Sequence, residues 1–262
     1  MRLAFSELRL HRASIIGWAV AMALLILMIV SAYPSVRGNT SINEIYANMS
    51  ASMQGILGGS DLVSPAGYLS TQAFSFFLPA ILLVFAVGRG AATLAGEEQD
   101  RTLDLLLAQP LPRWSAYLQK ALALVLSLMI LGVAILVPLV AFDTAVQFNL
   151  AVSGLAAVVV QTILFCVALA LWSQAISAAV GRRVVGVAAV TGYAVVSYFV
   201  YGLSSSIEWL RHLRPLTLWR WSLGNDPLAS GFGGMECLVL CVTGAVAIGV
   251  GLWAFNRRDL HN

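Results

Sequence analysis

The stretch Glu97-Glu98-Gln99-Asp100-Arg101-Thr102-Leu103-Asp104 interrupts an otherwise apolar chain and decides how that chain is arranged. It holds four of the 12 acidic residues in a sequence of 262 residues. Moving charge out of water is costly, so we expect this stretch to lie in water between two membrane spans. A water-facing segment between two spans is a place where a partner outside the bilayer can act on a membrane protein.

The composition of the whole chain agrees with a membrane location. Hydrophobic residues make up 60% of the sequence and charged residues 10%. Soluble domains carry roughly 25% charged residues, and a chain this apolar has too little polar surface to face water on all sides. We therefore predict an all-α integral membrane protein that crosses the bilayer several times.

Six intervals without charged residues are long enough for a spanning helix, which needs roughly 20 mostly apolar residues. The spans predicted from them lie at about 14–33, 69–90, 116–141, 155–180, 185–203 and 236–255. Little chain is left over, so we predict a single transmembrane domain over residues 1–262. Tryptophans and arginines are interleaved in the segment 204–234, which is typical of a helical cap at the external membrane interface.

The arginines and the single lysine near the span ends predict the orientation. With the N-terminus inside, about 11 of these 15 residues are cytoplasmic and about four are external. Both termini are therefore predicted to be cytoplasmic. Residues 1–12 are predicted to form an amphipathic helix at the cytoplasmic interface, with a frayed basic terminus as the alternative. The net charge of +3 reflects this topology, and no nucleic-acid partner is predicted.

The charged stretch has the periodicity of an amphipathic helix over residues 97–109. On a period of 3.6 residues, one face carries Glu97, Arg101 and Asp104 and the opposite face carries Leu103, Leu106 and Leu107. Pro110 ends the pattern. We predict a short helix with an apolar face on the membrane domain and an acidic face in the cytoplasm. A solvated loop without a partner is the alternative.

The second predicted span carries Gln72, Phe76 and Pro79. A proline inside a helix frees a backbone carbonyl and can kink the helix. A kinked helix with polar residues near one end suits the wall of a transport pathway, and ordinary helix packing explains the same residues equally well.

The sequence lacks the motifs expected of an enzyme. A P-loop needs Gly-Lys-Ser/Thr, but the single lysine, Lys120, follows Gln119, so this chain cannot hydrolyse ATP by that route. We predict no catalytic residue, no metal site and no cofactor bound by the chain. Cys166, Cys237 and Cys241 all fall within predicted spans, where packing is a better interpretation than a metal or redox pair.

One known family has a motif similar to the charged stretch. Glu98, then Thr102-Leu103-Asp104-Leu105-Leu106-Leu107-Ala108, then Pro110 and Arg113 resemble the cytoplasmic motif of ABC-2 type ABC transporter permeases, whose glycine is replaced here by Arg101. The Tyr33-Pro34 break, the Gly224-Asn225-Asp226-Pro227-Leu228 segment and the terminal Arg257-Arg258-Asp259-Leu260 also look like this family. The resemblance covers most of the chain and implies a six-helix half-transporter of the type V exporter kind.

The resemblance implies a function and a set of partners. Two such permeases, as a homodimer or a heterodimer, would pair in a bacterial inner (plasma) membrane and contact its lipids. Two separate P-loop ATPase subunits would bind ATP and Mg²⁺ and drive export of a hydrophobic or amphipathic substrate. The segment 97–109 would be the coupling helix, and residues 1–12 the connecting helix.

The resemblance also implies site residues. The contact with the ATPase would involve Glu97, Glu98, Asp100, Arg101, Thr102 and Asp104. The second and fifth spans would line the pathway, with Gln72, Phe76, Pro79, Tyr193 and Tyr198 as candidate lining residues. The alternative is a membrane scaffold or sensor subunit that transports nothing; secondary carriers and intramembrane enzymes are weaker alternatives.

Overall fold

The computed structural model describes residues 2–37, 44, 48–50, 53–54, 63–99, 112–146 and 148–257. Within these ranges the regular elements are helices: α1 (Arg2–Leu10), α2 (Arg12–Val36), α5 (Pro65–Leu69), η1 (Ser70–Phe74), α6 (Phe77–Ala92), α7 (Ala95–Gln99), α9 (Arg113–Val146), α10 (Val152–Val180), α11 (Arg183–Leu203), α12 (Glu208–Arg211), η2 (Arg214–Leu216), α13 (Leu218–Leu223), α14 (Pro227–Ser230) and α15 (Gly234–Arg257). In the described chain, six stretches are long and apolar enough to cross a membrane: α2, the combined stretch Pro65–Ala92, α9, α10, α11 and α15. The predicted all-helical fold with six candidate spans is confirmed.

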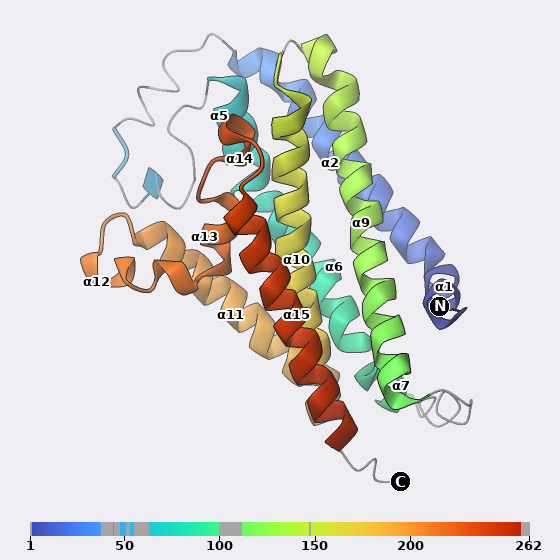
Figure 1. The fold of residues 1–262 in the computed structure, drawn as a ribbon. Helices are drawn as coiled ribbons and strands as arrows, with labels where there is room; N and C mark the ends of the chain where they lie inside the picture. The colour runs from blue at the N-terminus through green and yellow to red at the C-terminus, as the bar shows by residue number, and fades with distance from the viewer. Residues whose placement is uncertain are drawn as a thin grey trace.

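Helix α10 lies at the centre of the bundle, with α6, α9, α11 and α15 around it (Figure 1). Its most apolar window is 83% buried, against 22% in α11, so its polar side chains face other helices. Ser173 Oγ donates to the carbonyl oxygen of Val87 in α6 at 2.9 Å. Gln174 Nε2 donates to the carbonyl oxygen of Tyr117 in α9 at 3.4 Å. Such interhelical bonds hold helices together in a medium that offers polar groups no other partner.

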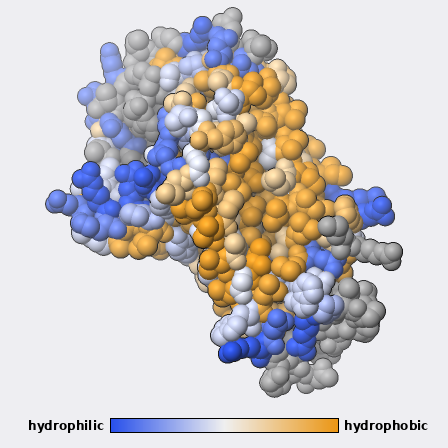
Figure 2. Space-filling model, viewed as in Figure 1, coloured by the Kyte–Doolittle hydropathy of each residue, from blue (hydrophilic) through white to orange (hydrophobic). Residues whose placement is uncertain are grey.

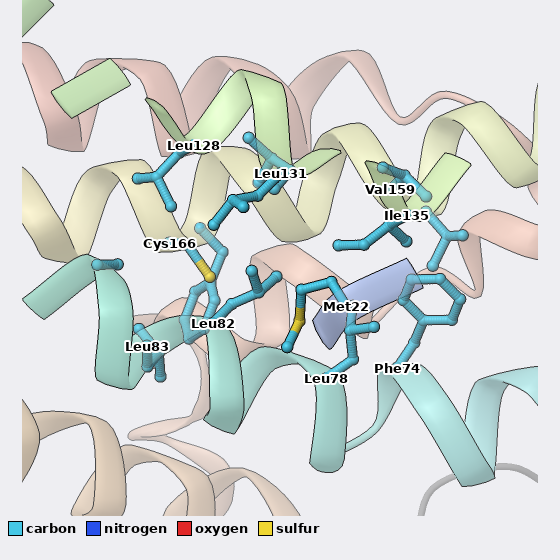
Figure 3. Packing of buried hydrophobic residues seen from close by; sticks show 14 of the residues in the cluster. Met22, Phe74, Leu78, Leu82, Leu83, Leu128, Leu131, Ile135, Val159 and Cys166 are labelled. Carbon is cyan, nitrogen blue, oxygen red and sulfur yellow. The ribbon is translucent and has the colours of Figure 1, made fainter. Parts of the chain in front are cut away.

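The main core forms where α2, the second span, α9 and α10 meet (Figure 3). Its labelled members include Met22, Phe74, Leu82, Leu131 and Cys166, each from one of these four parts of the fold. Cys166 is fully buried among these apolar side chains, which is the packing role expected of a buried free thiol.

The second span is not one continuous α-helix. Helix α5 passes into a π-helix, η1, and the chain then turns at Ser75 and Phe76 before α6 begins. Ser75 Oγ donates to the carbonyl oxygen of Ser70 at 2.7 Å across this break. Pro79 is the third residue of α6, where it has no amide hydrogen to donate to the preceding turn. The expected distortion at Pro79 therefore appears as a break one turn before it.

The segment between α11 and α15 folds back against the bundle as α12, η2, α13 and α14, away from α7 (Figure 1). Trp219 of α13 is its anchor, with 2% of its surface exposed. Its Nε1 donates to the carbonyl oxygen of Ala194 in α11 at 3.1 Å. Its ring lies 4.8 Å from that of Phe165 and 5.0 Å from that of Tyr198, centroid to centroid. A polar-tipped aromatic thus ties this segment to both α10 and α11.

A second attachment of the same segment is polar. The Asn225 side-chain amide donates to the carboxylate of Glu236 in the first turn of α15, and Glu236 is 6% exposed. With its amide oriented to satisfy both neighbours, Gln161 of α10 donates to the carbonyl oxygen of Ser222 at 3.1 Å and accepts from the amide of Gly233 at 3.3 Å. These bonds explain why polar residues occur in this part of an apolar chain.

The surface of the bundle is apolar between two hydrophilic ends (Figure 2). Exposed apolar side chains follow one another along α15, at Leu238, Val242, Val246 and Val250, and along α2. This distribution is what a bilayer requires, because lipid tails accept apolar side chains and exclude charge.

Candidate functional site

A groove with a volume of about 830 Å³ runs between the second span and α11. The second span contributes Phe76, Ala80, Leu83, Val84 and Val87 to its wall. Helix α11 contributes Val187, Thr191, Ala194, Val195 and Tyr198. Both sets recur every three or four residues, so one face of each helix forms a wall of the groove.

Three of the five candidate pathway residues lie together on this groove. Gln72, Phe76 and Tyr198 line it, although they come from different spans. Pro79 is buried and is not part of the groove wall. Tyr193 lines a second cavity of about 490 Å³ between α10, α11 and α15. There its hydroxyl donates to the carbonyl oxygen of Leu216 at 2.9 Å and accepts from the amide of Leu218 at 3.3 Å. Tyr193 therefore holds the segment after α11 in place.

Aromatic rings gather at one end of the groove. The ring centroid of Phe76 lies 4.9 Å from that of Tyr198, and Tyr198 lies 5.0 Å from Trp219 and 5.9 Å from Phe199. Phe77 adds an edge-on contact to Phe76 with a centroid distance of 5.8 Å. The break at Ser75 and Phe76 places Phe76 and Phe77 at this end of the groove, and α11 and α13 supply the other rings.

The chemistry of the groove wall favours apolar or aromatic ligands. Among the lining residues, Arg183 is the charged one, at the start of α11, and the hydroxyls of Thr71, Thr191 and Tyr198 are the other main polar groups besides Gln72. A largely apolar cleft of this size with a few polar groups is the common form of a small-molecule site. It can bind by burying apolar area, and it offers no arrangement of nucleophile and base.

Several residues that line the groove, among them Thr191 and Trp219, were not predicted from the sequence. Thr191 lies one helical turn from Val187 and two from Tyr198, so the spacing on α11 was a signal available in the sequence. Trp219 carried no such signal, because it lies outside the spans and reaches the groove only through the folding of the segment after α11.

The α7 end of the bundle carries the other candidate region. Glu97 of α7 directs Oε1 to Nζ of Lys120 in α9 at 2.5 Å. Glu7 of α1 reaches the same Nζ through its Oε1 at 2.9 Å. The side chain of Lys120 is 1% exposed, and those of Glu7 and Glu97 are 14% and 25% exposed. Charged side chains this buried are almost always paired. Here the lysine comes from α9 and its two carboxylate partners come from α1 and α7.

The remaining candidates for the ATPase contact are only partly described. Glu98 lies in α7 and is half-buried. Asp100, Arg101, Thr102 and Asp104, and with them most of the predicted helix 97–109, lie outside the described residues. Their role stays a prediction. Neither Lys120 nor Glu7 was predicted as part of this region, although a single lysine at the edge of an apolar run was a usable signal.

His11 lies beside this group, between α1 and α2. Its Nε2 is 3.6 Å from Oε2 of Glu7. Burial lowers the pKa of His11 below its ordinary value of 6.5, and the positive charge of Arg89 lowers it further. The carboxylate of Glu7 opposes both effects, and Lys120 adds a smaller lowering. The balance favours the neutral imidazole in the folded protein.

No group of three or more His, Cys, Asp or Glu side chains among the described residues is placed to hold a metal ion. Cys237 and Cys241 both lie on α15 as free thiols, the second of them exposed. The two regions that hold unusual chemistry in the described chain are thus the apolar groove and the ion pairs around Lys120.

The chain was compared with known proteins. Residues 3–256 match the family model described as "Multidrug efflux system permease Rv1217c, C-terminal domain". No curated protein and no solved structure gives a significant match. The family match covers nearly all of the chain, including both walls of the groove and all six candidate spans.

Proposed function

The chain belongs to this family of multidrug efflux permeases, which are ABC-type permeases, and on that premise we propose that it exports hydrophobic or amphipathic molecules with energy from separate ATPase subunits. It is a multi-pass membrane protein and a membrane transport subunit. No ATPase domain is evident in the chain. The substrate class, the partners and the direction relative to the membrane belong to the proposal.

The groove between the second span and α11 is the observation that supports the proposal most directly. Its wall is apolar and aromatic, and its lining includes Trp219 of α13 and Arg183 at the start of α11. A molecule held there by apolar burial meets no fixed set of hydrogen-bond partners, so one groove can accept ligands of different shape. This property suits a multidrug substrate range. The transport-free scaffold is not retained, because the family is one of efflux permeases.

The energy source is proposed to lie in two partner subunits that bind ATP and Mg²⁺ through P-loops. The segment 97–109 would receive them, and α7 is the described beginning of that segment. Helix α7 follows α6 directly, and α6 forms one wall of the groove, so a displacement of the segment reaches that wall through a short connection.

A second permease, identical or related, is proposed to complete the transporter. The exposed apolar side chains of α11, among them Val195, Val196 and Phe199, are available to it or to lipid. The α7 end is proposed to face the cytoplasm of a bacterial cell, since it carries α1, Arg89 and Arg183.

Reconstitution in lipid vesicles with the cognate ATPase tests the proposal. We expect ATP-dependent movement of a hydrophobic dye by the wild-type complex. The double variant Asp100→Lys, Asp104→Lys should insert normally and lose most of its co-purifying ATPase, because it reverses the acidic face of the segment. The variant Glu208→Lys on exposed α12 is the matched charge reversal and should retain the ATPase. Normal ATPase recovery and transport by the double variant would show that the contact lies elsewhere.

A further inference from the structure

Lys120 joins three elements that are far apart in the sequence. It lies in the third turn of α9, and its Nζ contacts Oε1 of Glu7 in α1 at 2.9 Å and Oε1 of Glu97 in α7 at 2.5 Å. One ammonium group with three hydrogens can serve both carboxylates at once. The N-terminal helix and the start of the cytoplasmic segment therefore meet at one atom of the third span.

The surroundings of Lys120 make this arrangement sensitive to charge. Its side chain is 1% exposed, so its charge is compensated mainly by the two carboxylates and little by water. Without the ammonium, Glu7 and Glu97 would face each other as like charges in a poorly solvated place. Among the described residues, Arg89 of α6 and His11 of the turn between α1 and α2 also act on Glu7 or feel its charge, and Arg183 of α11 acts on Arg89.

Contacts that do not involve Lys120 also hold α1 and α7 against the bundle. The amide of Leu3 donates to Oε1 of Gln119 at 3.1 Å, and Ala4 is 1% exposed, so α1 should stay packed on α9 without Lys120. Leu94, just before α7, and Ala95, its first residue, are 2% and 1% exposed, and Leu94 belongs to a small cluster with Tyr117 of α9. Substitution of Lys120 should therefore loosen the joint between α1 and α7 and leave the bundle folded.

We propose that Lys120 is a positioning residue of the transporter: it locks the start of the cytoplasmic segment to α1 and α9, so that a push on that segment moves the spans. The proposal rests on the proposed ATP-driven function and adds a division of labour to it. Glu97 acts within the chain by binding Lys120, and contact with the ATPase falls to residues later in the segment.

Inversion of all three charges provides the test. Lys120→Glu alone places three like charges together. The triple variant Lys120→Glu, Glu7→Lys, Glu97→Lys restores attraction in both pairs, and its two longer lysines compensate for the shorter side chain at position 120. Arg9→Glu, a charge reversal at an exposed position of α1, is the control. All are reconstituted with the ATPase in vesicles, and dye transported per ATP hydrolysed is measured.

We expect Lys120→Glu to retain its ATPase but to lower dye transported per ATP by about tenfold or more, and the triple variant to recover most of the loss. A purely structural role would reduce the amount of folded complex and leave this ratio unchanged. A wild-type ratio in Lys120→Glu, or no recovery in the triple variant, overturns the proposal.

A second measurement separates this proposal from the function on which it rests. Thermal unfolding of the permease alone, in lipid discs, reports on the ion pairs without any partner. The midpoint should fall in Lys120→Glu and return in the triple variant. If the wild-type complex shows no ATP-dependent transport, the proposed function fails. Equal unfolding midpoints across the series would separately show that the ion pairs of Lys120 with Glu7 and Glu97 do not hold α1 and α7 together.

Discussion

The carbonyl oxygen of Ala170 in α10 lies so close to Gly90 of α6 that a Cβ atom on Gly90 would clash with it. Glycine at this position lets the backbones of α6 and α10 touch, as small residues do at helix contacts in membranes. One wall of the groove is thereby held against the central helix of the bundle.

Gly90→Ala should destabilise the protein, because the added methyl group meets backbone atoms that cannot rotate away. Overpacking of this kind costs about 1–3 kcal/mol. Gly88→Ala, two residues earlier on the same helix, meets no atom within 4 Å and should be neutral or more stable by about 0.5–1 kcal/mol. Thermal unfolding midpoints of the two variants in lipid discs check the difference. Equal midpoints would mean that α6 and α10 are farther apart than the structure has them.

Ala80→Trp should obstruct the groove. Ala80 is half-buried on the groove wall, so a large ring at this position projects into the space where a substrate is proposed to bind. We expect dye efflux to fall by roughly tenfold, which corresponds to about 1.4 kcal/mol of lost binding. Val133→Trp is the control, because Val133 of α9 is 60% exposed and lines neither cavity. Efflux that falls equally in both variants would contradict a substrate role for the groove.

The stability of the protein should fall in mild acid because of His11. Its pKa is lowered in the folded state, mainly by burial, so below about pH 6.5 the unfolded chain binds a proton that the folded chain resists. The stability that the neutral form provides is complete above that pH and is lost as the pH falls towards the lower, folded pKa. Unfolding midpoints between pH 7.5 and 5.5 should drop more in the wild type than in His11→Gln. Parallel pH profiles of the two proteins would exclude this contribution.

The sequence by itself determined the class of fold and most of the helices. Six apolar runs of spanning length, separated by charge, permit few structures in a bilayer, because a lipid-exposed backbone must satisfy its own hydrogen bonds. Phe76 and Tyr198 were named as pathway residues through the resemblance to a known family, and both line the groove. The spacing of apolar residues in the two spans fixes which residues of each helix share a face.

The tertiary structure alone decided which of those faces meet. Trp219 reaches the groove because the segment after α11 folds back against the bundle. Pro79 is not part of the groove wall, and the chain turns about one helical turn before it, at Ser75 and Phe76. The contact between the Glu97 carboxylate and Lys120, 23 positions along the chain, was not predicted from the sequence, and the expected contact of Glu97 with an ATPase stays a prediction. Local periodicity describes only which side of a helix is polar. The partner of that side depends on contacts between distant residues, which the packing of the whole bundle sets.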